Sequence, residues 1–163
     1  MKKILLLSVI LFLFISCRQK DKIETKDDSV IEFISSDGTI TVVNSVMRPA
    51  AKGMNSAIFL EIKNNSKEAD TLFSAESNVA ELVEIHETFR VNKDKMGMRH
   101  VENVVIQHDS IVKLKPGSYH IMLITLYEDA TIGNEVRAKL LFKNAGEIEF
   151  TAQVKDLLNI SKR

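Results

Sequence analysis

The feature that most constrains the fold of this chain is a series of short apolar runs with a period of two, separated by turn signals. In the run that begins at Ala57, the side chains of Ile58, Leu60 and Ile62 share one face of an extended segment. The runs are rich in Val, Ile, Thr and Phe, which favour strands. Many short strands at this spacing predict an all-β fold, specifically an antiparallel β-sandwich.

Nine segments are predicted to be strands. They are Val30–Ile34, Thr39–Met47, Ala57–Lys63, Leu82–Val91, Met98–Gln107, Ile111–Leu114, Tyr119–Leu126, Val136–Phe142 and Glu147–Val154. Clusters of Gly, Pro, Asn and Ser separate several of them, as turns require. The stretch Ala75–Glu84 could instead begin with a helical turn after Ser77 or Asn78, which would not change the fold class.

The N-terminal end has the pattern of a secretory signal. Lys2 and Lys3 precede an apolar run from Ile4 to Ile15. This run is shorter than the roughly 20 residues of a membrane-spanning helix, and its length is typical of a signal peptide. We therefore expect residues 1–16 to be a signal peptide.

Cys17, the only cysteine, follows this run directly. A small residue, Ser16, immediately before a cysteine resembles a bacterial lipobox, although Phe14 stands where the usual lipobox has Leu. We expect a lipid on Cys17 to hold the protein to a membrane on its extracytoplasmic side, in the cell envelope. An ordinary signal peptide followed by an unrelated cysteine is the alternative.

Residues 17–29 are predicted to be the lipidated cysteine and a charged tether, and residues 30–163 a single domain. The chain has 22 basic and 22 acidic residues, and removal of residues 1–16 would leave a net charge of about −2. This balance lacks the basic patch that a nucleic-acid-binding protein carries. With its one cysteine at the anchor, the domain has no thiolate for a metal, so a soft-metal site would need methionine.

Histidines and methionines gather in the second half of the chain. His86, Met98, His120 and Met122 fall within 37 residues. His120 and Met122 are two apart in a predicted strand, so their side chains point to the same face.

Two imidazoles and two thioethers form a neutral, soft donor set that suits Cu(I). Zinc sites use Cys, His and carboxylates, and a blue-copper site needs a cysteine ligand. The alternative interpretation is that the methionines only fill gaps in a β-core. Met96 is a candidate spare thioether because it lies two residues before Met98, whereas His100 and His108 are better read as solvated histidines. Met47 and Met54 could line the rim of the site, and packing in the core or on the surface is the alternative for both.

The spacing resembles that of the periplasmic Cu(I)-chaperone family often called PCuAC. Its pattern is a His with an optional Met beside it, then ten residues, a Met, twenty-one residues and His-x-Met. The intervals between His86, Met98, His120 and Met122 match this pattern. The segments Val83–Glu87 and Lys115–Leu123 also look like that family, and the similarity covers most of residues 39–143. The optional Met position is Glu87 here, and the C-terminal end lacks the Met- and His-rich tail of many members.

The resemblance implies a cupredoxin-like Greek-key β-sandwich with Cu(I) bound near its surface. It implies that His86, Met98, His120 and Met122 are the ligands. It also implies delivery of copper to an extracytoplasmic acceptor, either the copper centre of a cytochrome oxidase subunit or another copper chaperone.

Two other functions are compatible with the sequence. One is an envelope copper buffer or resistance protein, and the other is an interaction β-sandwich that binds no metal. An enzyme is not expected, because there is no nucleophile elbow, and four protein ligands would leave a metal no open position for substrate.

Overall fold

The computed structural model describes residues 31–157. The predicted signal peptide, Cys17 and the charged tether lie outside these described residues. Within residues 31–157 there is no α-helix, and none of the length and hydropathy needed to cross a bilayer. The eleven strands are β1 (Glu32–Ile34), β2 (Ile40–Met47), β3 (Ser56–Asn64), β4 (Asp70–Glu76), β5 (Ala80–Arg90), β6 (Met96–His100), β7 (Val104–Ile106), β8 (Ser110–Leu114), β9 (Tyr119–Leu126), β10 (Glu135–Phe142) and β11 (Gly146–Val154). The prediction of an all-β fold is confirmed.

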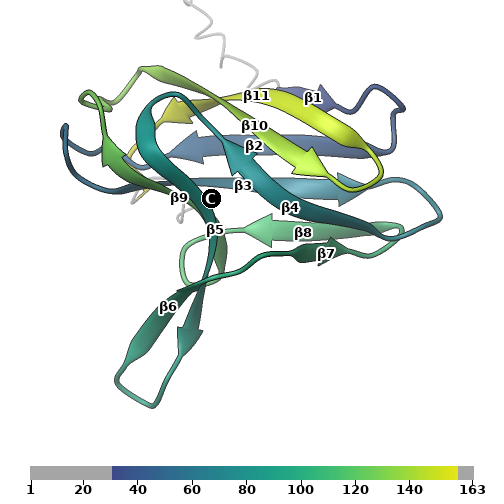
Figure 1. Ribbon diagram of the computed structural model, residues 1–163, viewed down its shortest axis with the longest axis horizontal. Coiled ribbons are helices and arrows are strands. Elements are labelled where there is room, and N and C mark those ends of the chain that lie inside the picture. The colour runs from purple at the N-terminus through teal and green to yellow at the C-terminus, as the bar shows by residue number, and fades with distance from the viewer. Residues whose placement is uncertain (1–30, 158–163) are drawn as a thin grey trace, which may run out of the picture.

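The strands form one hydrogen-bonded path that folds over on itself in two layers (Figure 1). Its order is β6-β5-β9-β3-β2-β11-β10-β4-β7, with β1 added to β2 and β8 added to β3. The two layers also meet where β4 lies against β5 and where β7 lies beside β8. All pairs between strands are antiparallel except that of β11 with β2, which is parallel, so the sheet is mixed rather than purely antiparallel.

The core lies between the two layers and is almost entirely aliphatic. Alternation along β3 sends Ile58, Leu60 and Ile62 inward, as predicted. In β9, Ile121 and Leu123 are fully buried, so the strand's other face remains for His120 and Met122. The largest fully buried side chains are Ile40, Met47, Ile58, Leu60, Ile62, Leu72, Ile106, Leu114, Ile121, Leu123, Leu126 and Leu140. Met47 therefore belongs to the core, and the suggestion that it lines the rim of a metal site is wrong.

Two of the strand predictions need correction. The segment Met98–Gln107, predicted as one strand, is divided between β6 and β7, which pair with different strands at opposite ends of the path. The strand β4 was not predicted, and the helical turn considered after Ser77 is instead a short bend between β4 and β5.

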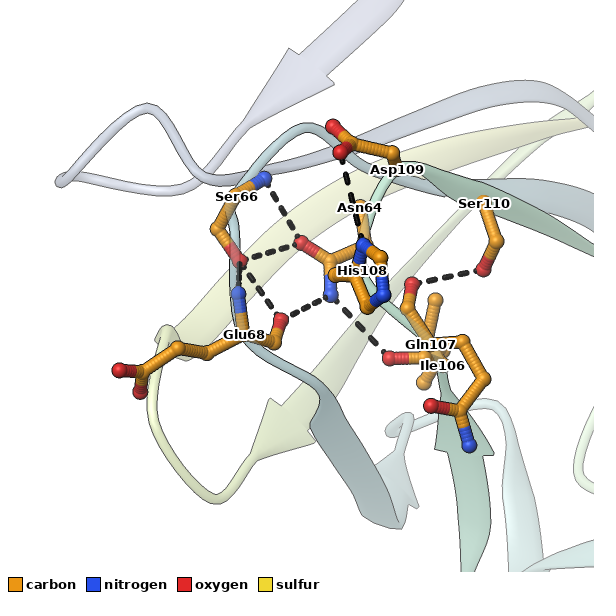
Figure 2. Close-up of polar contacts among 8 residues, drawn as sticks. All are labelled: Asn64, Ser66, Glu68, Ile106, Gln107, His108, Asp109 and Ser110. Atoms are coloured by element: carbon orange, nitrogen blue, oxygen red, sulfur yellow. Dashed lines mark hydrogen bonds and ion pairs between the residues drawn. The ribbon is translucent and has the colours of Figure 1, made fainter.

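A buried asparagine holds the turn between β3 and β4 against β7 (Figure 2). The amide nitrogen of Asn64 donates to the backbone oxygens of Glu68 (2.8 Å) and Ile106 (3.1 Å). Its oxygen accepts from the backbone nitrogen and the hydroxyl of Ser66, at 2.9 and 2.7 Å. Because every polar atom of this side chain is paired, its burial avoids the roughly 1–3 kcal/mol that an unsatisfied buried group costs.

The hairpin of β5 and β6 extends beyond the body of the sandwich as a two-stranded arm (Figure 1). Only the part of β5 up to Glu87 pairs with β9, and β6 pairs with β5 alone. The base of this arm brings His86 of β5 next to His120 of β9, whereas Met98 lies further out along β6.

Candidate metal centre

Three histidines stand opposite one another on three adjacent strands. His86 in β5 is the direct register partner of His100 in β6 and of His120 in β9. Direct partners in an antiparallel pair point to the same face of the sheet. The ring centroids of His86 and His120 are 5.9 Å apart, and those of His86 and His100 are 6.2 Å apart. We call these three residues the histidine row.

The candidate methionines flank the histidine row on the same face. Met122 is the register partner of Glu84, and Met98 is the partner of Thr88. Each methionine is therefore a diagonal neighbour of His86, with a Cα separation of roughly 7–8 Å. Met122 and Met98 lie on opposite sides of the row, which brackets the imidazoles between two thioethers.

His120 is buried, with 3% of its surface exposed. Its Nδ1 donates a hydrogen bond to the backbone oxygen of Ser118 at 3.0 Å, because a carbonyl oxygen can only accept. Burial lowers the pKa of His120, and the nearby His86 and Arg48 lower it further against the opposing effect of the Ser118 hydrogen bond. The ring is thus favoured in its neutral form, with the lone pair on Nε2.

His86 is hydrogen-bonded through Nε2, whereas His120 is hydrogen-bonded through Nδ1. Its Nε2 lies 2.7 Å from a carboxylate oxygen of Glu84, two residues earlier in β5. Its Nδ1 is the one buried side-chain nitrogen or oxygen between residues 31 and 157 without a hydrogen-bond partner. The imidazoles of His86 and His120 therefore each have one nitrogen hydrogen-bonded to the protein and one nitrogen available to a ligand.

The structure brings the candidate residues His86 and His120 together, and Met122 lies beside them on β9. Met98 is less enclosed, since 52% of its surface is exposed on β6. Met96 shares the face of Met98 but lies two residues further from the histidine row along β6, where it pairs with Arg90.

The other candidates from the sequence lie outside this constellation. His108 is exposed in the turn before β8, 3.5 Å from the carboxylate of Asp109. Met54 is 61% exposed in the loop before β3. Among residues 31–157, no three His, Cys, Asp or Glu side chains form a group that could hold a metal ion.

Glu84 and His100 also lie beside the candidate ligands, although they were not included in the site predicted from the sequence. Glu84 precedes His86 by two positions, and His100 follows Met98 by two, so period two places both on the face of the ligands. That His100 stands opposite His86 depends on the register of β5 with β6, which the sequence leaves open. Glu87 points to the other face, where its carboxylate accepts from Nε and Nη2 of Arg99 at 3.0 and 2.7 Å.

A family model described as "putative lipoprotein LpqE-like" matches residues 40–154 of this chain. The chain belongs to the LpqE-like family. A relative in the same class, putative lipoprotein Lxx21020 of Leifsonia xyli subsp. xyli (strain CTCB07), is 27% identical over 117 residues, which are 72% of this chain and 70% of the relative. The match to the family model covers every strand of the described domain except β1.

Solved structures with the same fold include PCuAC domains. The copper-bound PCuAC domain from PmoF2 matches with a TM-score of 0.63 and 19% identity, over 77% of this chain and 97% of that domain. The apo PCuAC domain from PmoF1 matches with a TM-score of 0.64 and 21% identity, over 77% and 98%. The Cu(I) form of DR1885 from Deinococcus radiodurans matches with a TM-score of 0.52 and 20% identity, over 69% and 76%. The cupredoxin-like sandwich predicted from the sequence is thus confirmed as the fold.

Proposed function

We propose that this chain is an extracytoplasmic metallochaperone that carries one Cu(I) ion on His86, Met98, His120 and Met122. The observation that carries the proposal is the pair of opposed imidazoles, each with one committed and one free nitrogen, between two thioethers on one face. The family name and the copper-bound proteins of the same fold support it.

The geometry of the imidazole pair fits a shared ion. Two imidazoles that bind one ion at roughly 2 Å from each nitrogen have ring centroids roughly 5–6 Å apart, depending on the angle at the ion, and those of His86 and His120 are 5.9 Å apart. The four proposed donors carry no charge when the histidines are neutral, which favours a soft monovalent cation over Ca²⁺ or Mg²⁺.

The unequal burial of the ligands fits a protein that releases its cargo. His120 is 3% exposed, whereas Met98 is 52% exposed on β6, the terminal strand of the path. An acceptor can therefore approach the ion from the side of Met98 while His120 still holds it. We propose the copper centre of a cytochrome oxidase subunit, or another copper chaperone, as that acceptor, and a lipid on Cys17 as the membrane anchor.

The test is a competition titration of the metal-free domain against a Cu(I) chelator. We expect one Cu(I) per domain, with Ag(I) as a mimic and much weaker binding of Zn²⁺. His86→Ala and His120→Ala should each lower the affinity at least tenfold, because each removes a ligand. His108→Ala, which removes an exposed histidine outside the site, is the matched control and should leave the affinity unchanged. Equal loss in the control, or no binding by the wild type, would contradict the proposal.

A transfer experiment separates a chaperone from a copper buffer. The Cu(I)-loaded protein is mixed with the metal-free copper-binding domain of an oxidase subunit, and the copper content of each is measured after separation. A chaperone should transfer its ion faster than free dissociation allows, whereas a buffer should transfer it only at the dissociation rate.

A further inference from the structure

The contact between Glu84 and His86 determines which nitrogen of His86 carries the proton. The two side chains project from the same face of β5, and Glu84 Oε2 lies 2.7 Å from His86 Nε2. A carboxylate can only accept a hydrogen bond, so Nε2 is the protonated nitrogen. The side chains of His86 and Glu84 are only 14% and 27% exposed, which limits competition from water for this bond.

The remaining nitrogen of His86 is buried without a partner. With Nε2 protonated, Nδ1 of the neutral ring carries a lone pair. Leaving such an acceptor buried and unpaired is unfavourable, and a metal ion is a ligand that removes this cost. The ring stands between His100 and His120 in the histidine row, where a cation shared with His120 would lie.

Building on the proposed copper-binding function, we infer that Glu84 is a positioning residue that fixes the tautomer of His86, so that His86 binds Cu(I) through Nδ1 whereas His120 binds through Nε2. The backbone oxygen of Ser118 holds the Nδ1 proton of His120 in the same manner. Partners of this kind orient the ring of a metal-binding histidine and raise its basicity. His86 thus offers Nδ1 and His120 offers Nε2 to the ion. Glu84 on β5 fixes the tautomer of His86, and the backbone oxygen of Ser118, just before β9, fixes that of His120.

Glu84 does not coordinate the ion in this arrangement, because the oxygen nearest the ring is engaged by Nε2–H. Replacement of Glu84 by Leu removes the acceptor, frees the ring to change tautomer and should weaken Cu(I) binding by about 10- to 100-fold, the range typical for such partners. Glu84→Gln keeps an amide oxygen in place to accept from Nε2–H and should restore most of the affinity.

Glu87→Leu is the matched control. It makes the same change of charge one residue from His86, but Glu87 lies on the opposite face and contacts Arg99 instead of an imidazole. We expect Glu87→Leu to bind Cu(I) like the wild type.

The direct test is ¹⁵N NMR of the imidazole rings in the metal-free protein near neutral pH. We expect the Nε2–H tautomer for His86 and the Nδ1–H tautomer for His120, and a mixture of tautomers for His86 in Glu84→Leu. On addition of Cu(I), the ¹⁵N signals of His86 Nδ1 and His120 Nε2 should shift most.

The outcomes separate this inference from the proposed function. An Nδ1–H tautomer for His86, a larger Cu(I)-induced shift at its Nε2 than at its Nδ1, or an unchanged affinity in Glu84→Leu would overturn the inference while copper binding by the wild type still stands. A wild-type protein that binds no Cu(I) would overturn the proposed function, and the assignment of ligand nitrogens with it.

Discussion

At the scale of single residues, burial sets the charge of the histidine that anchors the site. The pKa of His120 is lowered mainly because the protein replaces water around its ring, and protonation would remove the lone pair on Nε2. The native protein therefore binds fewer protons than the unfolded chain at pH values just below 6.5, the ordinary pKa of histidine.

Stability should consequently fall as the pH drops below about 6.5. For His120 alone, the free energy of unfolding should decrease by up to about 1.4 kcal/mol per pH unit until the lowered native pKa is reached. The pKa of Asp37 is lowered to about 2, chiefly by the hydroxyl of Ser35, so its stabilising effect is present above pH 3.8 and is lost only as the pH falls below that value, outside this range. Urea unfolding of the metal-free domain between pH 5 and 7.5 measures the effect.

A variant without the titrating ring provides the comparison. His120→Phe keeps an aromatic ring next to Phe59 and should show a flatter dependence of stability on pH than the wild type. His108→Ala, which removes an exposed histidine, should keep the wild-type dependence. The same slope in the wild type and in His120→Phe would contradict the role given to burial.

At the scale of elements, period two predicted most strands, and its failures have local causes. In β4, Leu72 pairs with Phe142 and Ser74 with Leu141, so the register shifts and Phe73 is exposed. This bulge places the buried positions Leu72 and Ala75 three residues apart, which hides the alternation from which the other strands were recognised.

The candidate site was predictable as a set of residues but not as an arrangement. Spacing and family resemblance supplied the four proposed ligands. The positions of Glu84 and His100 beside them follow from the order β6-β5-β9 and its register. Such order depends on contacts between distant segments, and periodicity within one segment carries no information about them.

The arm formed by β5 and β6 carries both methionines that could complete the proposed site, Met96 and Met98. Met98 is diagonal to His86, whereas Met96 is one pair of residues further along β6. Closing all four ligands on one ion requires the exposed Met98 side chain to turn toward the histidine row, which its flexibility permits. The same flexibility allows Met96 to substitute in part.

Met98→Ala should therefore weaken Cu(I) binding clearly but incompletely, by about tenfold. Met96→Ala should have little effect alone, and the double variant should bind more weakly than Met98→Ala. Chelator competition at fixed pH compares the three. A greater loss in Met96→Ala than in Met98→Ala would reverse the assignment, and a double variant equal to Met98→Ala would remove Met96 from the site.

At the scale of the whole molecule, the proposed anchor and the copper site lie at different parts of the chain. A charged segment separates Cys17 from the folded domain in the sequence. Membership of the LpqE-like family, which is described as a lipoprotein family, supports the proposed lipidation of Cys17. More than one acyl chain gives stable attachment, whereas a single chain is marginal.

Cys17→Ser should move the protein from the membrane fraction to the soluble fraction without changing Cu(I) affinity, because the sulfur is no part of the site. Fractionation followed by immunoblotting measures the distribution. A wild-type protein that is already soluble, or a variant that stays with the membrane, would argue against the anchor.

The central claim is that two imidazoles and two thioethers hold one Cu(I), and X-ray absorption at the copper edge of the loaded domain tests it most directly. We predict a first shell of two nitrogen and two sulfur neighbours, with both sulfur neighbours lost when Met96, Met98 and Met122 are all replaced by alanine. A wild-type first shell of nitrogen and oxygen alone, without sulfur, would contradict the account.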